Sequence, residues 1–257
     1  MFRSLRIAVL LVILLVVAVG TWQAKMRIAE WDVPLRVVVY PIAGDDSAAT
    51  RSYVASVDAA TYQPVERYVG EEAERYGIRT SFGQPLRIRV APRVDALPPP
   101  PPIGGNVLQV MWWSLALRWW AWSVDTYEGL EPDVQLFVVY HDPRERDTLE
   151  HSLGLEKGRI GVVNAFASDA MAGMNNVVVA HELLHTLGAS DKYDAGTMQP
   201  VFPDGYARPD LEPRHPQRFA EIMAGRIPVS DSEAAMPPSL NATLIGEATA
   251  REINWVK

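Results

Sequence analysis

Cysteine is absent from the 257 residues of this chain, and lysine and arginine form no cluster. Without cysteine there are no disulfides, no thiolate nucleophiles and no cysteine-ligated zinc. Without a basic patch, and with a net charge of −7, no nucleic-acid partner is expected. Disorder over most of the chain is not expected either, because 48% of the residues are hydrophobic and 21% are charged. The composition therefore predicts a globular protein and leaves its oligomeric state open.

The N-terminus carries a long uncharged run. Arg3 and Arg6 precede the apolar segment Ile7 to Trp22. As a helix this segment is about 24 Å long, and flanking side chains can extend its reach toward the roughly 30 Å of a hydrocarbon core. It is typical of a signal anchor, or of a signal peptide cleaved near Ala18-Val19-Gly20. We favour the anchor, which makes the protein extracytoplasmic and membrane-anchored; cleavage makes it secreted.

The rest of the chain predicts one α+β domain. We expect residues 1–22 to be the signal anchor or signal peptide, residues 23–33 a juxtamembrane link, and residues 34–257 the folded domain. Runs rich in β-branched residues predict strands; they lie at 35–42, 86–90, 134–140 and 159–166. Helical patterns and capping signals predict helices; they lie at 47–76 (in two parts, with Pro64 at the inner start), 171–187, 217–223 and 247–254.

Two further segments have unusual compositions. Pro98 to Pro102 is an unbroken proline run, which predicts a stiff loop. Met111 to Val124 holds five of the eight tryptophans, several of them at helical spacing. This segment is either a core helix with a bulky face or a helix at a membrane interface, where tryptophan is enriched. We favour the core helix, since only Arg118 supplies charge for a polar face.

The chemistry is concentrated in the predicted helix 171–187. His181-Glu182-Leu183-Leu184-His185 is an H-E-x-x-H motif, and residues four apart lie on one helix face, so both imidazoles can reach one metal ion. Glu182 stands beside them as a candidate general base. Gly188 follows the helix as a left-handed stop, which turns the chain so that a residue three positions further on returns to the metal. The motif extends to H-E-x-x-H-x-x-G-x-x-D, ending at Asp191.

This extended stretch resembles the metzincins, zinc endopeptidases in which two histidines and a third ligand past the glycine hold the metal. The third ligand is usually histidine; the aspartate version is similar to snapalysin-like and immune-inhibitor-A-type bacterial enzymes. The resemblance covers roughly residues 133–235 and implies Zn²⁺ bound by His181, His185 and Asp191. Asp194 is the rival third ligand. A methionine beneath the metal is also implied, for which Met223 is the candidate and Met198 a weaker one.

We therefore expect a zincin- or metzincin-like mixed twisted sheet with an active-site helix, preceded by the N-terminal transmembrane or signal helix. The expected function is hydrolysis of peptide bonds in extracytoplasmic protein or peptide, with Glu182 as general base. We also expect Arg159–Phe166 to be the edge strand that borders the cleft. Two alternatives remain: a gluzincin-type peptidase with Glu221 as ligand, and a membrane-anchored, zinc-containing binding or assembly protein without catalysis. The remaining histidines are interpreted as ordinary polar residues; they are His141, His151 and His215.

Overall fold

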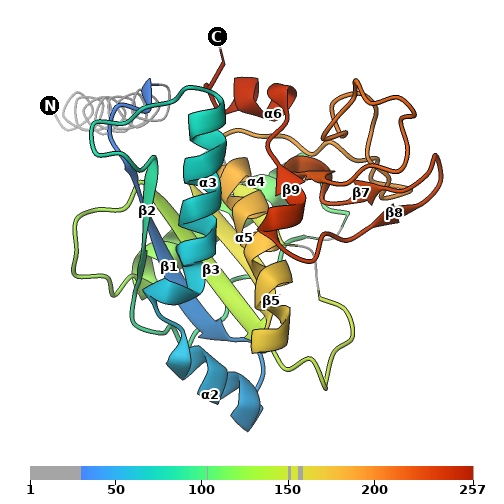
Figure 1. Cartoon of the computed structure of the whole chain (residues 1–257). Helices are drawn as coiled ribbons and strands as arrows, with labels where there is room; N and C mark the ends of the chain where they lie inside the picture. The colour runs from blue at the N-terminus through green and yellow to red at the C-terminus, as the bar shows by residue number, and fades with distance from the viewer. Residues whose placement is uncertain (1–29, 103, 150–151, 156–158, 257) are drawn as a thin grey trace, which may run out of the picture.

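The structure is a computed structural model that describes residues 30–102, 104–149, 152–155 and 159–256. These residues form an α+β fold around a mixed five-stranded sheet with the order β2-β1-β3-β5-β4 (Figure 1). Its strands are β1 (Leu35–Ala43), β2 (Leu86–Val90), β3 (Val134–His141), β4 (Leu153–Leu155) and β5 (Ile160–Phe166). The strand β1 pairs in parallel with β2 and with β3, and β3 pairs in parallel with β5, whereas β4 is antiparallel to β5. The predicted N-terminal anchor lies outside the described residues, and within them no helix is long and apolar enough to cross a membrane.

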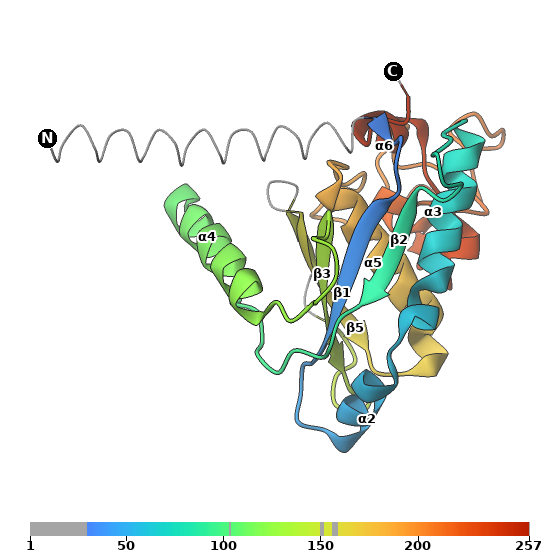
Figure 2. The same ribbon diagram turned by 90° about the vertical axis from the view of Figure 1, so that its left-hand side faces the viewer.

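Helices lie on both faces of the sheet (Figure 2). On one face are α3 (Gln63–Arg75) and α5 (Ala172–Thr186), and on the other is α4 (Val107–Val124). Central strands covered on both faces are apolar throughout, which explains the continuous hydrophobic runs of β1 and β3. Val37 and Val39 pack on the α3 and α5 side, and Val38 and Tyr40 on the α4 side.

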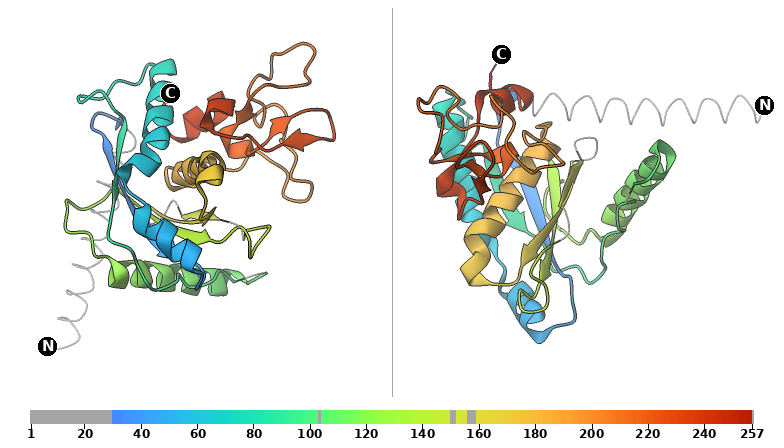
Figure 3. Two further views of the ribbon diagram at one scale, coloured as in Figure 1. Left: turned by 60° about the horizontal axis from the view of Figure 1, so that its bottom comes forward. Right: turned by 90° about the vertical axis from the view of Figure 1, so that its right-hand side faces the viewer.

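Smaller elements complete the fold. The helix α2 (Ala48–Ser56) and the short η1 (Ala59–Tyr62) precede α3, so the predicted two-part helix is confirmed, with Pro64 in the first turn of α3. The C-terminal part lies beyond α5, on the side of the sheet away from α4 (Figure 3). It holds two small ladders and a final helix: β6 (Ala220–Glu221) with β9 (Thr243–Leu244), β7 (Ile227–Pro228) with β8 (Ala234–Ala235), and α6 (Glu247–Glu252).

Four expectations need correction. The segment 159–166 is not the edge strand: β5 lies between β3 and β4, and the short β4 forms the edge. The segment 217–223 is not a helix but the strand β6 followed by a short 3-10 turn, η4 (Ile222–Ala224), because the side chain of Glu221 caps that turn. The remaining two concern the predicted link and the tryptophan helix.

The predicted link 23–33 ends earlier than expected. Trp31 is buried, its indole nitrogen donates to the carbonyl oxygen of Ile253 at 2.8 Å, and its ring packs edge-on against Trp255. The chain is therefore fixed to the folded body from residue 31 onward.

The tryptophan helix α4 is not a core helix over most of its surface. Only Leu117, Trp120 and Ala121 are buried, against the α4 side of the sheet. Trp112, Trp119 and Trp122 are exposed. The strong apolar composition reflects one contact with the sheet and a larger surface that no described part of the chain covers.

Candidate metal centre

The helix α5 places both histidines of the motif on one side. The two imidazole rings lie nearly perpendicular, with centroids 4.6 Å apart. Nδ1 of His181 donates to the carbonyl oxygen of Ile222 at 2.9 Å, and Nδ1 of His185 donates to that of Ala189 at 2.8 Å. Because a carbonyl only accepts, the proton resides on each Nδ1, and each Nε2 is left to face a common point. Backbone carbonyls commonly orient metal-binding imidazoles in this way.

Asp191 faces the same point. Its Oδ1 lies 3.2 Å from Nε2 of His181 and 3.1 Å from Nε2 of His185. Tetrahedral ligands about 2.0–2.2 Å from a zinc ion lie about 3.3–3.6 Å from one another, so the three atoms are spaced within a few tenths of an ångström of a zinc site. Two nitrogens and one carboxylate oxygen are also a donor set that zinc accepts. The residues present therefore fit the ion that the motif implies.

The electrostatics of the cluster favour a cation between these atoms. Burial alone raises the pKa of Asp191, but its hydrogen bonds and charge interactions with the two histidines lower that pKa well below its usual value. Burial lowers the pKa of His181, and the hydrogen bond to Asp191 with the charge of Glu182 raises it above its usual value. His181 thus gains from positive charge at Nε2, and a metal ion at this point can supply that charge.

Glu182 is buried beside the histidines. Its oxygen lies within 4.8 Å of the histidine donor atoms. Its Oε2 has no hydrogen-bond partner among the described residues, and burial raises the pKa of this carboxyl group. A buried carboxyl oxygen without a partner is costly in a fold, and such groups commonly belong to functional sites. This oxygen is free to accept a hydrogen bond from a water molecule or ligand that enters the centre.

The loop after α5 is built to return Asp191 to the helix. Gly188 has φ of 108°, and the amide of Ala189 donates to the carbonyl oxygen of Leu184 while that of Gly188 donates to His185. This pair of bonds is the Schellman motif, in which the left-handed residue is usually glycine. The predicted role of Gly188 as the helix stop is confirmed.

The residues on both sides of Asp191 are fixed to α6. Lys192 is buried and its ammonium contacts both carboxylate oxygens of Glu252 at 2.7 and 2.8 Å. The same carboxylate accepts from the amide and hydroxyl of Ser190. Burial raises the pKa of Glu252, but the hydrogen bonds from Lys192 and Ser190 lower it below its usual value. This clamp was not visible in the sequence, because Lys192 and Glu252 are sixty residues apart.

The turn around Met223 lies against the histidines. The carbonyl oxygen of Ile222 accepts from His181, and that of Met223 accepts from the amide of Lys192 at 3.0 Å. Met223 itself is fully buried. The turn closes at Gly225, whose φ is 67°. This segment therefore supports both the first histidine and the loop that carries Asp191.

Glu221, the alternative ligand, has another task. Its Oε2 accepts from the amides of Met223 and Ala224, and its Oε1 accepts from the amide of Gly246 and the hydroxyl of Thr249. Burial raises the pKa of this carboxyl group, although the hydrogen bonds oppose the shift. Four donors on two oxygens leave Glu221 holding the Met223 turn together, which argues against a metal-ligating role.

Asp194, the rival to Asp191, caps a local turn. Its Oδ1 accepts from the amides of Gly196 and Thr197 and from the hydroxyl of Thr197. Met198 closes the same turn, with its amide bonded to the carbonyl oxygen of Asp194. Asp191 therefore lies beside the histidines, whereas the side chain of Asp194 forms an Asx turn with the residues that follow it.

Two neighbours of the centre were not found from the sequence. Tyr193 lies close enough to Asp191 to feel its charge; burial raises the pKa of the phenol, and the negative charge of Asp191 raises it further. Gly154 in the edge strand β4 approaches α5 so closely that a Cβ there would lie 2.4 Å from Cβ of His185 and 2.7 Å from the carbonyl oxygen of Glu182. The spacing D-x-Y after the motif was the available signal for Tyr193, whereas the three-residue β4 offered none.

The other described histidines lie apart from the centre. Nε2 of His141 contacts Asn164 at 3.2 Å, and Nε2 of His215 contacts the hydroxyl of Tyr206 at 3.1 Å. His151 lies outside the described residues.

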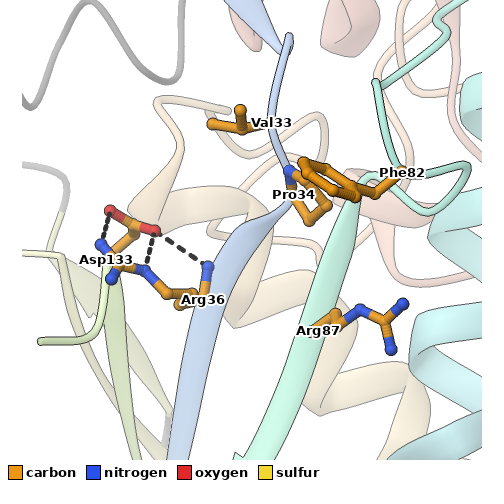
Figure 4. A pocket seen from close by; sticks show the side chains of 6 residues that line it. All are labelled: Val33, Pro34, Arg36, Phe82, Arg87 and Asp133. Carbon is orange, nitrogen blue, oxygen red and sulfur yellow. Dashed lines mark hydrogen bonds and ion pairs between the residues drawn. The ribbon is translucent and has the colours of Figure 1, made fainter. Parts of the chain in front are cut away.

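A hollow at the amino ends of β1 and β2 is also separate from the metal centre (Figure 4). It is lined by Val33, Pro34, Arg36, Phe82, Arg87 and Asp133. In this hollow Asp133 accepts hydrogen bonds from the backbone amide and the guanidinium of Arg36, so these two charged side chains are paired with each other.

A comparison with protein-family models finds no match, and neither does one with curated proteins. Among solved structures, wild-type OgpA from Akkermansia muciniphila is similar, with a TM-score of 0.37 and 12% identity. The match covers 85% of this chain and 59% of that chain, so this chain spans less than two thirds of that protein's length. A likeness this weak supports no conclusion about family or function.

Proposed function

We propose that this chain is a zinc-dependent endopeptidase of the metzincin-like zincin type. The observation that carries the proposal is that Oδ1 of Asp191 lies 3.1–3.2 Å from the Nε2 atoms of both His181 and His185. The unpartnered Oε2 of Glu182 lies beside them. His181, His185 and Asp191 hold the ion. Zinc, when bound, lowers the pKa of a bound water toward 7 and polarises a carbonyl oxygen.

Glu182 is the proposed general base. Its carboxylate accepts a proton from the attacking water, and the carboxylic acid then returns that proton to the departing amine, so the group is regenerated. Burial raises its pKa and so strengthens it as a base. A purely structural zinc site has no use for a buried base without a partner, which argues against the non-catalytic binding protein.

The edge strand β4 is the proposed binding strand for an extended peptide. Its one side pairs with β5, which leaves its outer side free among the described residues, and Gly154 brings it against His185 and Glu182. A substrate that adds to this edge by main-chain hydrogen bonds passes close to the metal centre. The substrate-binding edge expected of the segment 159–166 is therefore proposed for the adjacent strand β4 instead.

We further propose that the catalytic domain lies outside the cytoplasm, anchored by the segment Ile7 to Trp22. An alkaline phosphatase fusion after residue 257 is expected to be active. A stably expressed but inactive fusion contradicts this topology.

Glu182→Gln tests the catalytic proposal. We expect zinc content to stay at the wild-type level and cleavage of a casein or peptide substrate to fall about 10²–10⁴-fold, because the proton acceptor is lost and the ligands remain. Glu247→Gln, on the surface of α6, is the matched control and should cleave normally. Equal zinc content with near wild-type cleavage in Glu182→Gln refutes the mechanism.

A further inference from the structure

The helix α4 is apolar on nearly all sides, and much of it is exposed. From Val107 to Trp112 every residue is exposed, and Gln109 is the only polar one. Further along, the side facing away from the sheet stays apolar and exposed; it presents Trp112 (73%), Leu115 (54%), Trp119 (67%) and Trp122 (76%). Figure 2 shows α4 leaning away from the sheet along its length. A monomer in water rarely leaves so much contiguous apolar surface uncovered.

The projecting end is a well-formed helix terminus. The side chain of Asn106 accepts from the amide of Gln109, and the side chain of Gln109 accepts from the amide of Asn106. This reciprocal pair is a capping box, which satisfies backbone donors at the start of a helix. Trp113 fixes the helix to the proline loop by donating to the carbonyl oxygen of Pro99. The exposed turns at the start of α4 are therefore stabilised by specific hydrogen bonds.

The pattern of exposure indicates what covers the helix. A protein groove covers one face of a helix and leaves polar residues on the other, but residues 107–112 are exposed on all sides and apolar on nearly all. A lipid bilayer accommodates such a surface. Tryptophan is enriched where bilayer and water meet, because its ring is apolar and its indole N–H remains available to polar groups. The segment 107–124 also contains no acidic residue to repel lipid phosphates.

The chain length upstream brings a bilayer within reach. The apolar segment ends at Trp22, and the chain is fixed to the body at Trp31. The eight residues between them span at most roughly 26–29 Å, about the length of α4 itself. A bilayer that holds the N-terminal segment is therefore never far from the domain.

We propose that α4 is a second membrane contact, which docks on the lipid bilayer with its N-terminal turns inserted at the level of the headgroups and upper acyl chains. The inference rests on the proposed N-terminal anchor only for the nearness of the bilayer. Because the sheet separates α4 from α5, docking leaves the metal centre uncovered (Figures 2 and 3). Two contacts fix the orientation of the domain on the membrane, where one anchor leaves it free to rotate.

The absence of cysteine makes the test direct, because one introduced cysteine carries a single nitroxide label. The full-length chain is reconstituted in phosphatidylcholine vesicles as Leu108→Cys, with Met236→Cys as matched control, since Met236 is another exposed apolar residue and directly follows β8 in the C-terminal part of the fold. Collisions of the label with oxygen, which concentrates in lipid, are compared with collisions with a water-soluble nickel complex. We expect oxygen to dominate at position 108 and nickel to dominate at position 236.

The other outcomes overturn the docking proposal. Nickel dominance at both positions in vesicles that carry the protein refutes docking and leaves the anchor standing. Low collision rates with both reagents at position 108 show that protein covers the helix, and dipolar broadening between labels identifies a second copy as that protein. Failure of the chain to float with the vesicles removes the anchor and the docking together.

Discussion

The helices α5 and α4 lie on opposite faces of one sheet, and both are rich in apolar residues. In α5 most side chains are buried, and its histidines bond to carbonyl oxygens from two different segments. In α4 three residues are buried, and four tryptophans of five are at least partly exposed. A hydrophobic run thus predicts that a surface will be covered, but the rest of the chain determines whether the cover comes from within the molecule.

The largest expected difference concerns the site that α5 supports. We expect Asp191→Ala to weaken zinc binding by more than the 10–100-fold typical of a residue that only orients a ligand, because it removes one of three protein donors. Asp194→Ala should keep zinc affinity near wild type, since that carboxylate caps a turn. Zinc affinity measured by competition with a chromophoric chelator decides between them. Loss of zinc in Asp194→Ala with retention in Asp191→Ala reverses the assignment.

A matched pair of leucine truncations tests the difference between the helices themselves. Leu184 in α5 is buried, and Leu115 in α4 is 54% exposed. We expect Leu184→Ala to lower the free energy of unfolding by about 2–5 kcal/mol and Leu115→Ala to change it by no more than about 0.5 kcal/mol. Urea unfolding of both variants without lipid measures this. Equal losses would show that α4 is covered in solution, by a second copy or by another part of the chain.

Gly188→Ala tests the turn that ends α5, apart from the packing of the helix itself. The residue needs a positive φ, so a Cβ there costs about 1–3 kcal/mol of strain. Because the same turn returns Asp191 to the histidines, zinc affinity should fall together with stability. Gly77→Ala, at another positive-φ glycine remote from the motif, is the control for strain alone. A stability loss with unchanged zinc affinity would show that Asp191 is placed independently of the turn.

Much of this comparison was readable from the sequence, and the reasons for the rest are physical. The strands and α5 follow from local apolar patterns, and the H-E-x-x-H spacing places both histidines on one face by helix geometry alone. The edge position of β4 was missed because three residues, Leu-Gly-Leu, carry no pattern. The supporting roles of Glu221 and Glu252 were missed because each bonds to a partner distant in sequence, Thr249 and Lys192 respectively. The exposure of α4 was missed because composition alone does not show whether an apolar helix packs against the rest of its own chain.

The smallest expected effect is the pH dependence of the clamp behind Asp191. The folded-state pKa of Glu252 is lowered, so its ion pair with Lys192 contributes stability that is fully present above the unfolded-state pKa of about 4.3 and is lost as pH falls through the lower folded-state value. Glu252 is partly exposed, and we expect Glu252→Gln to cost about 1 kcal/mol at pH 7. Urea unfolding with a chelator present, which removes the pH dependence of zinc binding, should show the difference between wild type and variant shrinking as pH falls below about 4.3. A difference that stays constant down to pH 3 would mean that packing, and not charge, fixes this loop to α6.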